Sequence, residues 1–278
     1  MSPKMEEGQR RVPRTLVASI SGVIACGKTT AIKRLRKSGL LKAALPANWH
    51  LSFVREPSEL WQKKGWLAKF YADPSHNAAA FQFQAFCTYV EAVEKTLKDD
   101  PCPADCDVHV LVVERSMYDQ RMFWMKQHTA GMTTADENYD EAYTLVWNRW
   151  RCFIPEVNII FFFSTSDINT TMQRMRARAR AEELGASFSS AEDCTGLVSA
   201  EPAAKIEQVG GVTLEYQQEL LNMHREWFTE PVAYPLGAPP AGIPCVWINA
   251  DAPTHDDDGS LQALAERLAG HIKAVQIQ

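Results

Sequence analysis

The sequence has no apolar run long enough to cross a membrane, and it has no excess of positive charge. Its 278 residues carry a formal net charge of -5, which argues against a general binder of nucleic acid or of anionic membranes. The N-terminal stretch MSPKMEEGQRRVPR lacks the apolar core of a signal peptide, and its paired glutamates are unlike a transit peptide. We therefore expect residues 1–13 to be a disordered leader and the protein to be cytoplasmic, with neither nucleic acid nor a membrane as partner.

Cysteine and histidine are too scattered to build a disulfide framework or a zinc site. The seven cysteines are an odd number, as in reduced intracellular proteins, and only CPADC (102–106) resembles a pair. That pair has no second half for zinc, and none of the seven histidines has a partner at metal spacing. The 46% hydrophobic content predicts instead a single globular domain over residues 14–278 with a sizeable core.

Apolar runs alternate with helical patterns along the chain. Four β-branched runs are typical of buried strands, and a fifth is weaker: 15–20, 108–113, 157–164, 245–250 and, weaker, 50–54. Helical spacing covers 29–39, 78–100, 140–153, 167–183, 213–228 and 260–275. The alternation predicts the α/β class, with a five-stranded parallel sheet and helices on both faces. Residues 184–212, rich in Ala, Ser and Gly, are expected to form an inserted surface segment.

A phosphate-binding loop follows the first predicted strand. The stretch GVIACGKTT matches the pattern G-x-x-x-x-G-K-[ST] and lies between a strand and a helix, as such a loop requires. Its glycines let backbone N–H groups face a phosphate at the start of a helix. Lys28 is placed to reach the β- and γ-phosphates, and Thr29 to bind Mg²⁺. The sequence predicts ATP or GTP binding by Gly22, Val23, Ile24, Ala25, Cys26, Gly27, Lys28, Thr29 and Thr30.

Three further stretches suit a site next to that loop. Glu56, in VREPSELW, follows a predicted strand and could accept a proton from an attacking hydroxyl. Glu114 and Arg115, in VVERSMYDQRMFW, follow the next strand and could hold a metal ion and a phosphate. Gln84, in FQFQAF, could bond a heterocyclic base through its amide. Together these stretches indicate a phosphate donor beside a flat heterocycle.

The arginine-rich segment RMRARARAEE, residues 174–183, has two interpretations. In one it is a solvated helix in which Arg178 and Glu182 form an i,i+4 pair. In the other it is an anion clamp, because arginines that close over a transferring phosphate stabilise its charge.

With these motifs in this order, the chain resembles the deoxynucleoside kinases over most of residues 14–250. The shared stretches are SGVIACGKTT, REPSELW, FYADP, FQFQAF, ERSMYDQRMFW, RARAEE and LEYQQELLNMHREW. The resemblance implies a P-loop kinase fold with an arginine-rich lid over 174–183. It also implies a homodimer that, with Mg²⁺, transfers the γ-phosphate of ATP to the 5′-OH of a deoxynucleoside.

The resemblance further implies roles for single residues. Glu56 would be the general base, and Arg115 would hold both Glu56 and the phosphate. Glu114 would lie on the Mg²⁺ side with Thr29, and Lys28 would serve catalysis. In the lid, Arg178 and Arg180 would clamp the phosphates, Arg174 would lie against adenine, and Glu183 would bond the sugar 3′-OH. The implied base and sugar pocket consists of Trp61, Leu67, Phe70, Tyr71, Phe83, Gln84, Gln120 and Trp124, with Gln84 reading the base edge and Trp124 stacking on it.

Several features depart from the family pattern. The segment from Tyr71 to Gln84 is two residues longer than usual, and Ser21 replaces the glutamate that commonly precedes the loop glycine. Glu91 and Gln120 stand where an Arg–Asp pair lies beside the base in some members. A carboxylate of Glu91 near the base would favour adenine, cytosine or guanine over thymine. A thymidylate-type nucleotide kinase and a non-catalytic subunit of the same fold remain alternatives.

Overall fold

A parallel five-stranded sheet forms the centre of the molecule. The computed structural model describes residues 13–133, 138–178, 183, 211–229, 242–251 and 257–275. The strands are β1 (Arg14–Gly22), β2 (Trp49–Val54), β3 (Val108–Glu114), β4 (Val157–Ser164) and β5 (Cys245–Asn249). Their order is β2-β3-β1-β4-β5, and every neighbouring pair is parallel. The predicted α/β sheet is confirmed, including the weak second strand.

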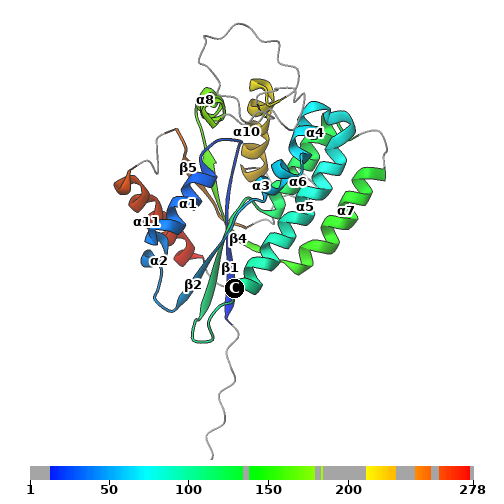
Figure 1. The fold of residues 1–278 in the computed structure, drawn as a ribbon. Helices are drawn as coiled ribbons and strands as arrows, with labels where there is room; N and C mark the ends of the chain where they lie inside the picture. The colour runs from blue at the N-terminus through cyan, green and yellow to red at the C-terminus, as the bar shows by residue number, and fades with distance from the viewer. Residues whose placement is uncertain are drawn as a thin grey trace, which may run out of the picture.

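Helices cover both faces of this sheet (Figure 1). One face carries α1 (Lys28–Ser38), α2 (Leu40–Ala44) and α11 (Asp258–Ala274). The other carries α5 (Pro74–Asp99), α6 (Met117–Thr129) and α7 (Asn138–Trp150), which the 3-10 turn η1 (Arg151–Phe153) extends. The helices α3 (Ser58–Lys63) and α4 (Trp66–Ala72) pack near α5, and α8 (Ile168–Arg178) contacts α10 (Leu214–Thr229).

Alternation along β1 divides the interior into two cores. Leu16, Ala18 and Ile20 join the core beneath α1 and α11, while Val17 joins the core beneath α5 to α7. This is the period of two that a strand buried on both faces must show. The even positions of β1 therefore serve one helical layer, and the odd positions serve the other.

Several short helices were not predicted. The helices α2, α3 and α4 have only 5, 6 and 7 residues, too few to show a helical period. Helix α6 begins with a capping box, in which Ser116 and Asp119 satisfy each other's backbone N–H. The predicted stop of α1 at Gly39 is observed: its φ of 70° is left-handed, a conformation that glycine adopts without steric cost because it has no Cβ.

Parts of the predicted organisation lie outside the described residues. These are residues 1–12 of the leader, residues 179–182 of the lid and residues 184–210 of the insertion. The two described flanks of the insertion meet, because the backbone N–H of Val212 donates to the carbonyl of Glu183 at 2.8 Å. In the described part of the chain, no helix is long and apolar enough to cross a membrane.

Candidate active site

The loop between β1 and α1 is shaped by left-handed backbone. Gly22, Ala25 and Gly27 have φ angles of 143°, 59° and 101°. A Cβ at Gly22 would lie 2.6 Å from the carbonyl oxygen of Phe163 and 2.9 Å from the Cys26 Sγ. Only glycine fits there, so close packing against β4 explains the first glycine of the motif.

The amine of Lys28 lies inside this loop. It donates hydrogen bonds to the carbonyls of Gly22 at 3.0 Å and Val23 at 2.7 Å. Burial, and after it the charge of Arg115, lowers the pKa of Lys28. A phosphate at the loop would offset that cost by giving the ammonium an anionic partner.

Thr29 and Glu114 supply two oxygen ligands at the same place. The Thr29 hydroxyl donates to the Glu114 carboxylate, and Glu114 ends β3 with 2% of its surface exposed. Hydroxyl and carboxylate oxygens suit Mg²⁺, which is usually held by one or two protein groups together with substrate phosphates. Among the described residues no cluster of three or more His, Cys, Asp or Glu could hold a metal alone. The pair therefore fits a metal that arrives with a nucleotide.

Glu56 and Arg115 form a buried ion pair next to the loop. The Arg115 Nε lies 2.8 Å from the Glu56 Oε1, and the Arg115 Nη1 donates to the Gly22 carbonyl at 2.9 Å. Arg115 has a left-handed φ of 63°, which is uncommon for a residue with a Cβ. Burial raises the pKa of Glu56 against the opposing charge of Arg115, and Glu114 adds to the rise. A carboxylate with a raised pKa is a better proton acceptor near neutral pH.

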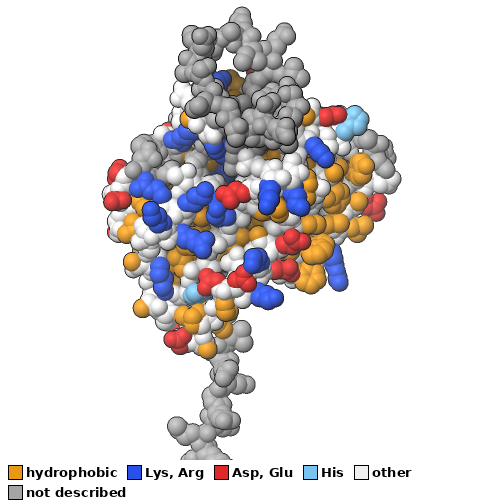
Figure 2. Space-filling view, viewed as in Figure 1, with side chains coloured by type: hydrophobic (Ala, Val, Ile, Leu, Met, Phe, Trp, Pro, Cys, Tyr) orange, Lys and Arg blue, Asp and Glu red, His pale blue; other side chains and the backbone are white. Residues whose placement is uncertain are grey.

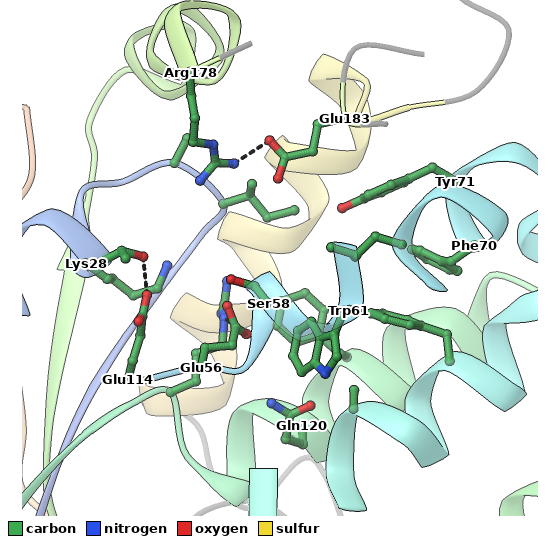
Figure 3. A pocket seen from close by; sticks show the side chains of 18 of the residues that line it. Lys28, Glu56, Ser58, Trp61, Phe70, Tyr71, Glu114, Gln120, Arg178 and Glu183 are labelled. Carbon is green, nitrogen blue, oxygen red and sulfur yellow. Dashed lines mark hydrogen bonds and ion pairs between the residues drawn. The ribbon is translucent and has the colours of Figure 1, made fainter. Parts of the chain in front are cut away.

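A cavity of about 550 Å³ extends from the loop between α3, α4, α5 and α6 (Figure 3). Its volume is within the range of small-ligand sites. Most of the predicted site residues line it: Ile24, Ala25, Gly27, Lys28, Thr29, Thr30, Glu56, Trp61, Leu67, Phe70, Tyr71, Glu114, Arg115, Gln120, Arg174, Arg178 and Glu183. Gly22, Val23 and Cys26 are part of the loop without lining the cavity.

Aromatic rings form the wall of the cavity away from the loop. Phe70 stacks on Phe81 at 5.0 Å, and Trp61 meets Phe81 edge-on at 5.5 Å. The Trp61 Nε1 donates to the Thr88 hydroxyl at 2.9 Å, which fixes the indole plane. Tyr71 lies above this wall, and burial together with the nearby Glu183 raises its pKa well above the usual value. Such a wall suits a flat ring.

The structure does not bring Phe83 and Gln84 to the cavity. The residues of this stretch that line it are Phe81 and Gln82. Phe83 instead packs edge-on against Trp124, at 5.7 Å. Gln82 is 2% exposed, and its Oε1 has no hydrogen-bond partner within the described residues. The sequence contained a sign of this difference. The segment from Tyr71 to Gln84 is two residues longer than the family pattern, whereas the segment from Tyr71 to Gln82 has the usual length.

Trp124 also lies outside the cavity, contrary to the prediction. It is fully buried, stacks on Tyr143 at 4.1 Å and donates from Nε1 to the Asp140 carboxylate at 2.7 Å. Its neighbour Phe123 lines the cavity instead, with the Arg115 guanidinium 4.7 Å from its ring centre. Trp124 therefore belongs to the core between α5, α6 and α7.

Glu91 lies outside the cavity. It is exposed on α5 and does not line the cavity, so the expected preference for bases with an amino group loses its premise. The glutamine side chains that line the cavity are those of Gln82, Gln120 and Gln127. Gln82 Oε1, Gln120 Nε2 and Gln127 Oε1 are buried and have no hydrogen-bond partner in the described part of the structure.

The described lid residues face the cavity. Arg178 forms an ion pair with Glu183, and both line the cavity opposite the loop (Figure 3). Arg174 donates to the carbonyl of Ala250 at 2.7 Å, which holds its guanidinium at the rim. Arg180 and Glu182 lie outside the described residues. Within the described residues Arg178 thus has Glu183 as its partner, and it lines the cavity.

Comparison with known proteins shows the family to which the chain belongs. The family model described as deoxynucleoside kinase matches residues 18–193, more than half of the chain. The chain is also 25% identical over 268 residues to a protein of fowlpox virus (strain NVSL) named as a probable deoxycytidine kinase. That alignment covers 93% of this chain and 89% of the viral protein. The chain therefore belongs to the deoxynucleoside kinase family, and it is a kinase of the nucleoside-phosphorylating kind.

Proposed function

We propose that the protein transfers the γ-phosphate of ATP to the 5′-OH of a deoxynucleoside. The observation that carries the proposal is the Glu56–Arg115 pair, which lies between the phosphate loop and an aromatic, amide-lined cavity. The loop suits the phosphates of a donor, and the cavity suits a base and its sugar. The Glu56 carboxylate lies between the loop and the cavity, where it can accept a proton from the hydroxyl that attacks the phosphate.

The donor is held by positive charge on two sides. Lys28 and the loop N–H groups would bind the phosphates from one side, and we propose that Arg178 and Arg180 bind them from the lid. Thr29 and Glu114 would hold Mg²⁺, which would supply positive charge to offset the negative charge of the transferring phosphate. Arg174 lies at the rim, where the adenine of the donor would rest.

The acceptor hydroxyl loses its proton to Glu56. As the 5′-oxygen forms its bond to the γ-phosphorus, the bond from that phosphorus to the β,γ-bridging oxygen breaks and ADP leaves. Arg115 and Lys28 face the oxygens on which negative charge increases, so they stabilise the transition state more than the ground state. Glu183 and Tyr71 lie across the cavity, where they hold the sugar 3′-OH.

Three neutral amides read the base. Gln82, Gln120 and Gln127 line the cavity, each has a buried amide atom without a hydrogen-bond partner among the described residues, and each amide offers a donor and an acceptor. A buried amide left unpaired costs about 1–3 kcal/mol of free energy. A nucleobase that pairs with these amides should therefore bind more favourably, by about that amount, than one that does not. The name of the viral relative makes deoxycytidine the first substrate to test.

We also propose a homodimer formed through the α7 side. Leu145, Trp150 and Phe153 are 64%, 38% and 53% exposed, whereas Trp147 is buried and donates to the Met117 carbonyl. Figure 2 shows hydrophobic side chains gathered over α5 and α7, and basic ones over the half with α1 and β2. Sedimentation velocity should show a dimer, and Leu145→Lys should produce monomer. A monomeric parent protein would contradict this part of the proposal.

An ADP-release assay tests the activity. The protein is supplied with Mg²⁺, ATP and each of the four deoxynucleosides, with thymidine 5′-monophosphate as a fifth acceptor and Lys28→Ala as the inactive control. Monophosphate formed from one or more nucleosides supports the proposal. Product from the monophosphate alone would indicate a thymidylate-type kinase, and no product from any acceptor would indicate a non-catalytic subunit.

A further inference from the structure

A buried carboxylate, that of Asp119, lies behind Arg115 and takes no part in the proposed transfer. Its side chain has no exposed surface. Its Oδ2 accepts three hydrogen bonds, from the Ser116 backbone N–H at 2.7 Å, the Ser116 Oγ at 2.8 Å and the Ser21 Oγ at 2.7 Å. Since Ser21 is the penultimate residue of β1 and Ser116 is the N-cap of α6, these donors tie the carboxylate to both elements that carry the site.

The other oxygen of Asp119 faces two basic side chains. The Arg115 Nη1 and the His224 Nε2 each lie 3.8 Å from Oδ1, within ion-pair range but too far for a hydrogen bond. His224 lies on α10, and its Nδ1 is 2.7 Å from the Leu220 carbonyl, so that nitrogen carries the proton of the neutral ring. Burial lowers the pKa of His224, which leaves Arg115 as the permanent cation beside Asp119.

Asp119 is an anion at neutral pH. Burial alone would raise its pKa, but the side-chain hydrogen bonds to its Oδ2 and the positive charge of Arg115 lower the pKa of Asp119. Arg115 therefore lies between two carboxylates, that of Glu56 on the cavity side and that of Asp119 behind it. When Glu56 takes up a proton it loses its charge, and Asp119 is then the counter-charge that Arg115 keeps.

We propose that Asp119 is a positioning residue whose permanent negative charge holds Arg115 against the phosphate loop while Glu56 gains and loses a proton. The inference rests on the proposed phosphoryl transfer, and it adds to that mechanism a permanent negative charge, that of Asp119, beside Arg115. Asp119 has a second effect, because its charge contributes to the raised pKa of Glu56, together with Glu114 and against Arg115 and Lys28.

Asp119→Asn is the direct test, because asparagine keeps the shape and still accepts from Ser21 and Ser116. We expect kcat to fall about tenfold or more while the KM values for nucleoside and ATP stay within about threefold. The acid limb of the kcat profile should move to lower pH, since loss of a nearby negative charge lowers the pKa of Glu56. Wild-type kcat and an unmoved acid limb in a folded variant overturn the proposal, and so does a kcat loss without that movement.

A second pair of variants decides the matter if Asp119→Asn does not fold. Ser21→Ala removes one donor to Asp119, and Ser19→Ala is its control, because the Ser19 Oγ contacts the Ser21 Oγ at 3.1 Å but not Asp119. We expect a kcat loss of about two- to fivefold in Ser21→Ala and less in Ser19→Ala, from the cost of one buried hydrogen bond. Equal kcat in the two variants overturns the proposal.

The parent protein separates the two levels of inference. If it phosphorylates no deoxynucleoside, the proposed function fails, and the role of Asp119 fails with it. If it phosphorylates one or more and the Asp119 and Ser21 variants behave like the parent, only the positioning role fails.

Discussion

The two ends of the cavity are built by different means. The phosphate end consists of main chain and of side chains at the carboxyl ends of β1 and β3, where strand pairing sets each position. The base end consists of side chains on α5 and α6, whose direction depends on helix rotation. A shift of two residues turns a helical side chain by about 200°, from the cavity to the opposite face. The phosphate end is therefore the part that short motifs predict well.

The largest expected effect tests the phosphate end. Glu56→Gln keeps the size and hydrogen bonding of the side chain but removes the proton acceptor, so kcat should fall about 10²-fold or more. Binding of ATP, measured by calorimetry, should change little, because the loop does not depend on this carboxylate. Wild-type turnover in the variant would contradict the assignment of the base.

The next effect is on pH dependence. Because Glu56 must be ionised to accept a proton, and burial raises its pKa, the acid limb of kcat should lie above the usual glutamate range of about 4.3. Below the limb, kcat should fall about tenfold for each pH unit, as for one ionisation. A profile measured from about pH 4 to 9 checks this, with binding of the ATP complex followed in parallel. A limb at or below the usual glutamate pKa of about 4.3 would show that the pKa is not raised.

A matched pair of variants tests the base end. Gln82→Leu should raise the deoxynucleoside KM roughly tenfold, since it removes a buried amide that the base pairs with. Gln84→Leu, on the same helix two residues later, is the control and should leave that KM within about twofold. The reverse result would show that Gln84 faces the base and that α5 is rotated relative to the structure described above.

The smallest expected effect concerns base choice. Glu91 is exposed and outside the cavity, so Glu91→Met should leave the ratio of kcat/KM between deoxycytidine and thymidine unchanged within about twofold. Rates for both nucleosides on both proteins provide the check. A clear change in the ratio would mean that Glu91 reaches the base after all.

The sequence predicts the parts of this protein whose signals are local. The five strands are apolar runs, and the loop motif carries its own spacing, so both are recognised without knowledge of the packing. The helices α2 to α4 are too short to show a period. Phe83 and Trp124 were misplaced because an aromatic residue in a helix serves a core as well as a ligand, and only packing decides which. Asp119 belongs to the local motif of a helix capping box, and its place behind Arg115 is visible only once Ser21, Arg115 and His224 meet.

The hydrogen bond between Val212 and Glu183 has a consequence for protein engineering. The segment between Glu183 and Val212 begins and ends at neighbouring positions, because this hydrogen bond joins the two residues. The entropy of closing such a loop grows only slowly with its length, so the fold places little restriction on the number of residues there. This position is therefore a natural insertion point, where a reporter peptide or a second domain could be added within reach of Glu183 without changing the sheet.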